Sequence, residues 1–174
     1  MKNNDEMKEK DRMGHEEEMD EKKKKKKYGK FAAMIATSTI IMHLLTYTNV
    51  YQLDHIYFSE TRFFLSLMMG SMMTVVMLLF MWKMYTDKTW NRMIIIGSAV
   101  IFVVSFWLMR SQTTVDDSAW MRSMIPHHSI AILTSENAQI TDPEVRELAD
   151  EIIEAQREEI EEMKRLLEKL KNAP

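Results

Sequence analysis

The chain has 174 residues, no cysteine and a formal net charge of −3, and its charged side chains are distributed very unevenly. Residues 1–30 carry eleven positive and nine negative side chains, residues 31–110 only five and three, and residues 111–174 seven and fourteen. The lack of cysteine excludes disulfide scaffolds and thiolate metal sites, and the acidic C-terminal third argues against nucleic acid as a partner. The weakly charged middle part is typical of a membrane domain.

This charge distribution predicts an all-α chain with three parts. Residues 1–30 are expected to form a disordered charged cytosolic tail, because a segment with so few apolar residues cannot bury a core. Residues 31–110 are expected to form a three-span membrane domain in the lipid bilayer, and residues 111–174 an external helical hairpin domain.

Three runs without an ionised side chain are the expected membrane spans: Phe31–Leu53, Phe63–Trp82 and Met93–Met109. The first two reach the roughly 20 residues that cross a bilayer, and the third is a little shorter. Seven lysines, Lys22–Lys27 and Lys30, directly precede the first run, and three basic residues lie between the second and third. Because lysine and arginine resist translocation, the N-terminus is expected in the cytoplasm and the C-terminal domain outside it.

The first two spans contain polar features of their own. Ser66, Gly70 and Thr74 recur every four residues, a spacing that lets two membrane helices approach closely. His43 lies near the middle of the first span, at the depth of a methionine-rich stretch of the second. These groups could form a second soft metal site, but we prefer the interpretation that the methionines fill a helix interface and His43 binds a neighbouring helix.

The external segment predicts two antiparallel helices. The first is expected to begin at Asp116 or Asp117 and to end near Asn137. The second should begin at Asp142, which is followed by proline as many helix starts are, and should end near Lys171.

One stripe of the first external helix carries side chains that bind soft metals. Asp117, Met121, Met124 and His128 are spaced by four, three and four residues, and His127 lies about 100° around the helix. Copper(I) accepts thioether and imidazole ligands, whereas zinc sites usually recruit thiolate, imidazole or carboxylate. The pattern therefore favours a copper(I) site, with silver and zinc as alternative metals. The competing interpretation is that the methionines only pack in the core.

Met163 lies on the apolar row of the second external helix. Counted from the Asn137–Thr141 turn, it is about 14 Å further along an ideal helix than Met124, too far for contact in one straight hairpin. Met163 is therefore expected either to meet the histidine region of a dimer partner or to belong to the core. In the second case the intramolecular neighbours of the metal-ligand stripe would lie near Ile152 and Gln156. The candidate metal ligands, in order, are His127, His128, Met124, Met121 and Met163.

Two helices of this length leave one apolar row half covered. A segment of about sixty residues is marginal as an isolated fold, so a homodimer that closes a four-helix bundle is expected. An enzyme is not expected, because the sequence has no Glu-x-x-His pair, phosphate loop or nucleophile elbow.

The external segment resembles a known family. Its motif consists of Asp117, Trp120, Met121, Met124-Ile125-Pro126-His127-His128, Ala131-Ile132, Asp142-Pro143-Glu144-Val145, Ala149, Ile152-Ile153, Gln156, Glu159-Ile160 and Met163. These residues are similar to the bacterial domain of unknown function 305 (DUF305) family, which includes CopM-type copper-binding proteins. At Thr134 the chain departs from relatives that carry methionine.

The resemblance implies a ferritin-like helical fold and a role in copper tolerance or trafficking. The expected protein is a membrane-anchored form in a bacterial inner membrane, with a copper transporter or chaperone as its partner. The alternative that the residues leave open is a structural or partner-docking membrane protein with no metal role.

Overall fold

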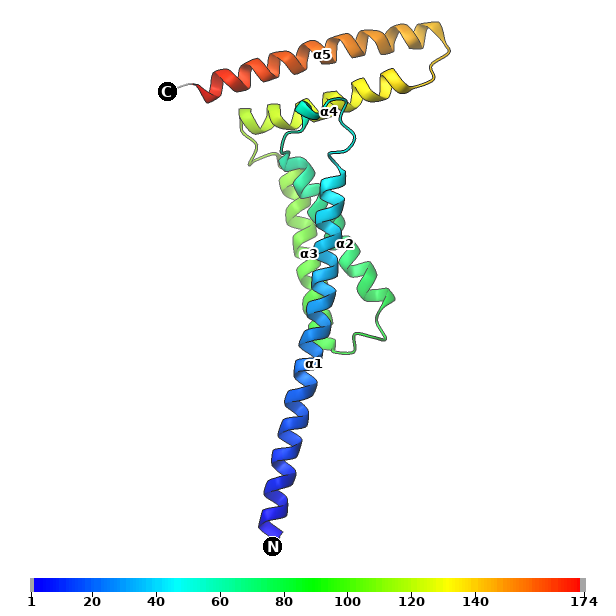
Figure 1. Cartoon of the computed structure of the whole chain (residues 1–174). Helices are drawn as coiled ribbons and strands as arrows, with labels where there is room; N and C mark the ends of the chain where they lie inside the picture. Colours follow the sequence, from blue (N-terminus) through cyan, green and yellow to red (C-terminus); the bar gives the residue numbers. More distant parts are fainter. Residues whose placement is uncertain (1, 173–174) are drawn as a thin grey trace.

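The computed structural model describes residues 2–172, apart from the side chains of residues 2–8, 10 and 11, and these residues form helices and no strand. The elements are α1 (Lys2–Leu45), the 3₁₀ helix η1 (Leu53–His55), α2 (Glu60–Phe80), α3 (Lys88–Ser111), α4 (Asp117–Asn137) and α5 (Pro143–Lys171). The expected all-α fold is confirmed. Figure 1 shows α1, α2 and α3 as a long bundle, with α4 and α5 lying across one end of it.

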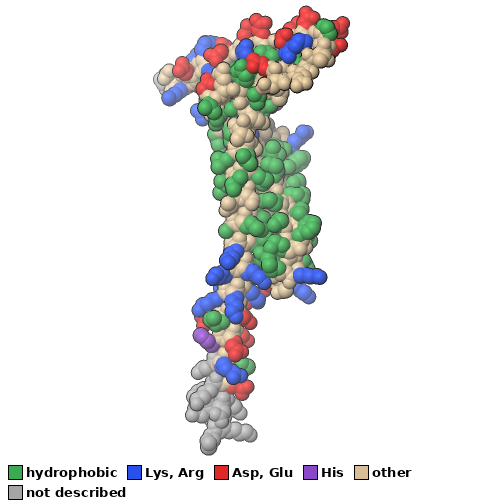
Figure 2. Space-filling model, turned by 45° about the vertical axis from the view of Figure 1, so that its right-hand side comes forward, with side chains coloured by type: hydrophobic (Ala, Val, Ile, Leu, Met, Phe, Trp, Pro, Cys, Tyr) green, Lys and Arg blue, Asp and Glu red, His purple; other side chains and the backbone are tan. Residues whose placement is uncertain are grey.

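Helices α1, α2 and α3 are long and apolar enough to cross a membrane. Many of their large apolar side chains are exposed, including Ile40, Leu79 and Val103. Figure 2 shows these hydrophobic side chains over the middle of the molecule, with basic side chains below them and acidic ones on the hairpin. An apolar band between two charged ends is the surface that a membrane domain presents to lipid.

The face of α2 with small residues packs against α1, as its spacing predicts. Ser66 and Gly70 are buried, and the backbone of Gly70 lies so close to Thr39 of α1 that no side chain fits between them. Ser66 donates to the carbonyl of Arg62 at 2.8 Å, so its hydroxyl accepts from Nδ1 of His43 at 2.9 Å. His43 therefore makes the predicted hydrogen bond to a neighbouring helix.

The first span ends earlier than its apolar run. The run extends to Leu53, but α1 ends at Leu45. The hydroxyls of Thr46 and Thr48 bond to carbonyls three residues earlier at 2.6 and 2.8 Å, and Arg62 donates to the Thr46 carbonyl at 2.7 Å. These bonds satisfy the last carbonyls of the helix, so the chain leaves it there.

The N-terminal segment differs from the expected disorder. Met1 lies outside the described residues, and from Lys2 onward the segment is the first part of α1. Its side chains form ion pairs along the helix: Arg12 with Glu16, Lys22 with Glu18, Lys23 with Asp20, and Lys24 with Glu21. Because the helix continues from the span, no new nucleation is required, and such pairs suffice to extend it.

The C-terminal hairpin of α4 and α5 has the predicted bounds. Asp116 caps α4 by accepting from the Ala119 amide at 2.7 Å, and Asp142 caps α5 by accepting from the Val145 amide at 3.1 Å. The two helices enclose one apolar core. Its buried members are Met121, Ile125, Ile132, Ile153, Ile160 and Met163.

The loop between α1 and α2 docks onto the hairpin through a buried polar cluster around Ser129 of α4. The Ser129 hydroxyl is fully buried, accepts from the Tyr51 amide at 2.7 Å and lies 3.0 Å from Nδ1 of the buried His55. At the rim, Lys164 of α5 binds the carboxylate of Asp54 at 2.7 Å. The hairpin unit therefore contains α4, α5 and this loop, although the sequence predicted only the two helices.

Burial controls the protonation of His55. Desolvation of its enclosed side chain lowers the pKa of His55 below the ordinary value of 6.5. The positive charge of Lys164 lowers this pKa further, whereas the carboxylates of Asp54 and Glu161 oppose the shift less strongly. The docked loop therefore favours a neutral imidazole, whose Nδ1 can accept a hydrogen bond from Ser129.

We expect acid to loosen this loop. A histidine whose pKa is lowered by docking binds a proton more readily when undocked, so docking is fully stable above pH 6.5 and weakens as the pH falls below that value. Hydrogen exchange at the Tyr51 amide, corrected for intrinsic rates, should be several-fold faster at about pH 5.5 than at about pH 7.5. His55→Gln should remove most of this difference, and an unchanged pH dependence in that variant would contradict the assignment.

Gly70→Ala should weaken the contact between α1 and α2. A Cβ at this position would lie 2.5 Å from Oγ1 of Thr39, so one helix must shift. We expect a loss of about 1–3 kcal/mol, seen as a lower unfolding temperature of the full-length protein in detergent. Gly97→Ala is the matched control, because a Cβ there meets nothing within 4 Å. Adding Thr39→Ala should restore most of the loss, and equal effects of the two glycine substitutions would refute the close contact.

Candidate functional site

His128 lies at the interface of α4 and α5 and is held there by a carboxylate. Its side chain is buried, with 8% of the residue exposed, and Nε2 lies 2.6 Å from Oε2 of Glu159 on α5. The same Oε2 accepts from the side-chain amide of Gln156 at 3.3 Å. Gln156, a polar residue in an otherwise apolar row, thus has its partner within α5.

This contact determines which nitrogen of His128 carries the proton. An ionised carboxylate only accepts hydrogen bonds, so Nε2 of His128 must donate to Glu159. In the neutral ring Nδ1 then has a free lone pair. This Nδ1 is buried and has no hydrogen-bond partner among the described residues. A buried acceptor without a donor is unfavourable by about 1–3 kcal/mol, unless something else binds it.

Thioethers lie one helical turn away from this pair. Met124 precedes His128 by four residues on α4, and Met163 follows Glu159 by four residues on α5. Because the helices are antiparallel, both steps lead to the same level of the hairpin. Met163 and Met121 are buried members of the hairpin core, and the half-buried Met124 packs against that core.

The expected offset between Met124 and Met163 is therefore wrong. The estimate assumed that both helices begin level with each other at the turn. In the structure α4 ends at Asn137 and α5 begins only at Pro143, and residues 138 and 142 are extended. An extended residue advances the chain about twice as far as a helical one, so the start of α5 projects beyond the end of α4 (Figure 1). Met163 belongs to the core. Along the hairpin it lies closer to the level of His128 than to the level of Ile152.

His127 does not join this cluster. Its side chain is exposed, whereas that of His128 is buried. The two rings are 6.0 Å apart with an angle of 63° between their planes. Of the five candidate ligands, the structure brings Met121, Met124, Met163 and His128 to one interface and leaves His127 outside it.

A groove at the open end of the hairpin reaches one of these thioethers. It has a volume of about 510 Å³. Its lining residues include Met121, the exposed Trp120 and the acidic pair Asp116 and Asp117. The groove gives an ion in solution a route past carboxylates to the edge of the methionine cluster.

The donor set of this interface is one imidazole nitrogen and three thioether sulfurs. Within residues 2–172, wherever side chains are described, no three histidine, aspartate or glutamate side chains gather as a metal site would require. Such a mixture of nitrogen and sulfur donors suits copper(I) or silver better than zinc. Tyr51 and Tyr57 of the α1–α2 loop pack against the same core. Sequence reasoning missed the docking of this loop on the hairpin. The signal that could have indicated it is the presence of three tyrosines, Tyr47, Tyr51 and Tyr57, in a short segment.

Comparisons with known proteins agree with the motif. Residues 108–174 match the family described as "Domain of unknown function (DUF305)". The chain is also 34% identical over 111 residues to "Uncharacterized protein L153" of Acanthamoeba polyphaga mimivirus, which covers 63% of this chain and 71% of the relative. No solved structure matches the chain. A bacterial origin and a link to copper stay predictions. The chain belongs to the DUF305 family.

Proposed function

We propose that the hairpin binds a soft metal ion, copper(I) or silver, between α4 and α5, and that α1, α2 and α3 anchor it in a membrane. The observation that carries this proposal is the unpartnered Nδ1 of His128, buried in the interface whose core contains three methionines, two of them one helical turn from His128 and Met121 a further turn away. A core whose only role is packing gains nothing from an imidazole with an unsatisfied nitrogen. A metal ion would satisfy it.

Glu159 fits the role of an orienting group. Histidines that bind metals commonly donate their second ring N–H to a carboxylate, which fixes the tautomer and raises the basicity of the ligating nitrogen. His128 and Glu159 have this arrangement, with a separation of 2.6 Å. Glu159 would therefore support the site without binding the metal.

The methionines determine which metals fit. Thioethers are uncharged, soft donors that hold copper(I) and silver and bind zinc or calcium poorly. Met124 and Met163, each one turn from the His128–Glu159 level, could turn toward an ion beside Nδ1, because methionine has three rotatable bonds. Met121, one turn further along α4, would serve as a thioether on the way in from the groove. Storage, sensing and delivery to a copper transporter or chaperone would all use such a binding site without catalysis.

A second hairpin would complete the external domain. The apolar residues Val145 and Leu148 of α5 are 50% and 56% exposed, and Ile152 continues the same stripe. Two helices and a docked loop leave this stripe uncovered, and a second copy would cover it symmetrically. We therefore propose a homodimer whose hairpins form a four-helix bundle.

The alternative is a structural protein whose hairpin docks another helix. The exposed stripe of α5 fits this alternative as well as it fits a dimer. The alternative does not account for the unpartnered nitrogen of His128. Metal titration distinguishes the two proposals.

His128→Ala should weaken copper(I) binding by the full-length protein at least 100-fold, because it removes the one buried nitrogen donor of the proposed set. His127→Ala is the matched control, since the adjacent exposed imidazole should contribute less than threefold. Glu159→Gln should weaken binding by about 10–100-fold through the orientation of the ring. The measurement is competition with a copper(I) chelator under reducing conditions, repeated with silver and zinc.

Two results would contradict the proposal. Unchanged affinity in His128→Ala would exclude the buried site, and a larger effect of His127→Ala would move the site to the surface. Circular dichroism of each variant shows whether the helices persist.

The topology is a separate prediction. We propose that the lysine-rich end of α1 lies in the cytoplasm and the hairpin outside it, because the seven lysines between residues 22 and 30 resist translocation. A reporter that works only outside the cytoplasm should be active when it is fused after Pro174 and inactive when it is fused before Met1. The opposite pattern would place the hairpin inside the cell.

A further inference from the structure

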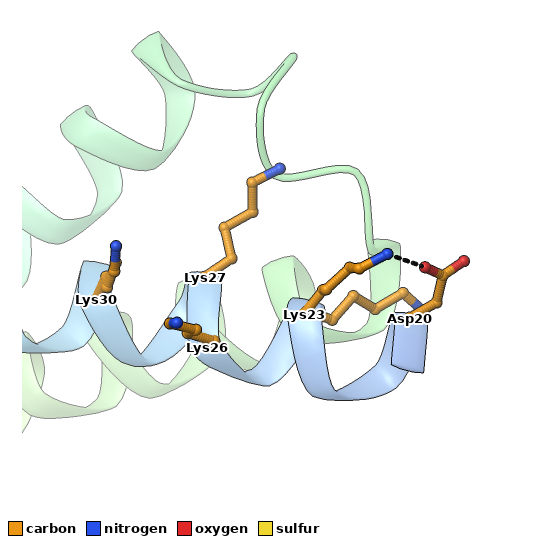
Figure 3. A pocket seen from close by; sticks show the side chains of 6 residues that line it. Asp20, Lys23, Lys26, Lys27 and Lys30 are labelled. Carbon is orange, nitrogen blue, oxygen red and sulfur yellow. Dashed lines mark hydrogen bonds and ion pairs between the residues drawn. The ribbon is translucent and has the colours of Figure 1, made fainter. Parts of the chain in front are cut away.

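Five lysines of α1 line a hollow next to the membrane bundle. The hollow has a volume of about 450 Å³, and its lining residues are Asp20, Lys23, Lys24, Lys26, Lys27 and Lys30 (Figure 3). Lys23, Lys26, Lys27 and Lys30 are separated by three, one and three residues, so they fall within about 100° of one face of the helix. These four lysines thus concentrate positive charge on one side of α1.

Part of this charge has no counter-charge in the protein. Lys23 pairs with Asp20 at 3.4 Å, and Lys24 pairs with Glu21 and Asp87. Lys27 donates to the Met84 carbonyl at 2.7 Å, which fixes its ammonium group without neutralising it. Among the described side chains, no carboxylate pairs with Lys26, Lys27 or Lys30, and Figure 3 draws no ion pair to them.

Aromatic rings place this charge at the membrane surface. The apolar part of α1 begins at Phe31, directly after Lys30. The Tyr28 ring lies 5.1 Å from Tyr85 and 5.5 Å from Trp90. Tyrosine and tryptophan rings concentrate at the headgroup level of a bilayer. Lys27 and Lys30 therefore lie at the depth of the lipid phosphates.

Along the axis of α1 the hollow is longer than a single phosphate group can span. Lys23 is seven residues before Lys30, about 10 Å along the helix axis. The polar region of one leaflet is only about 5–8 Å thick. A headgroup with a single phosphate can reach Lys30 and Lys27 but not Lys23, whereas a headgroup with additional phosphates can reach both ends.

We propose that this hollow binds one membrane lipid whose headgroup carries several phosphate groups. The lipid's phosphodiester would contact Lys30 and Lys27, and its outer phosphates would contact Lys26 and Lys23 in place of Asp20. The acyl chains would lie along the exposed apolar surface of α1. This inference depends on α1 entering a membrane and is independent of metal binding by the hairpin.

The test uses the full-length protein in neutral detergent and native mass spectrometry with phosphatidylinositol bisphosphate as the probe. We expect one lipid to bind, at least tenfold more tightly than phosphatidylserine. Lys26→Gln with Lys30→Gln should weaken binding by about 20-fold. Lys22→Gln with Lys25→Gln is the matched control, because it removes the same charge from lysines that do not line the hollow. All four side chains are exposed, so both variants should fold.

Three outcomes would overturn the proposal. Equal losses in the two double variants would show that only net charge matters. Equal affinity for phosphatidylserine would show that additional phosphates are not recognised. Soluble inositol trisphosphate that binds as tightly as the lipid would identify a free phosphate compound as the ligand instead of a membrane lipid.

Discussion

The pairing of His128 with Glu159 is the interaction on which the chemistry of the α4–α5 hairpin depends. It joins α4 to α5 at one level and so aligns the two helices. That alignment brings Met124 level with Met163. The same contact assigns the proton to Nε2 and leaves Nδ1 free. One hydrogen bond therefore links the packing of the hairpin to the chemistry that its interior can perform.

The α1–α2 loop connects this hairpin to the bundle of α1, α2 and α3. Tyr51 and His55 bind Ser129, which is the residue after His128 on α4. The linker between α3 and α4 is short, so it keeps α4 close to the ends of the membrane helices. The loop that joins α1 to α2 is therefore in direct contact with the helix that carries His128. A site held by both a linker and a loop is more rigid than one on a free hairpin.

Local signals predicted the elements well, and they could not predict how distant elements meet. Capping aspartates fixed the starts of α4 and α5, and runs without charge located the spans. The register of the hairpin depended on the extended residues between Asn137 and Pro143, whose conformation leaves no clear sequence signal. The docking of His55 on Ser129 joins residues far apart in the chain, and nothing periodic indicates it. For the double histidine, helical spacing separated the two rings by about 100°, but only packing decided which ring is buried.

The buried position of His128 opposes stability and favours binding. A leucine at this position would fill the core without an unsatisfied nitrogen, and Glu159 would return to water with little loss. The methionines around it are also weaker packing residues than leucine, because their flexible side chains lose more entropy on burial. A core designed only for stability would contain neither feature. Together they form a set of donors that a soft cation can use, and the binding energy of that cation would offset what the folded hairpin loses by keeping them.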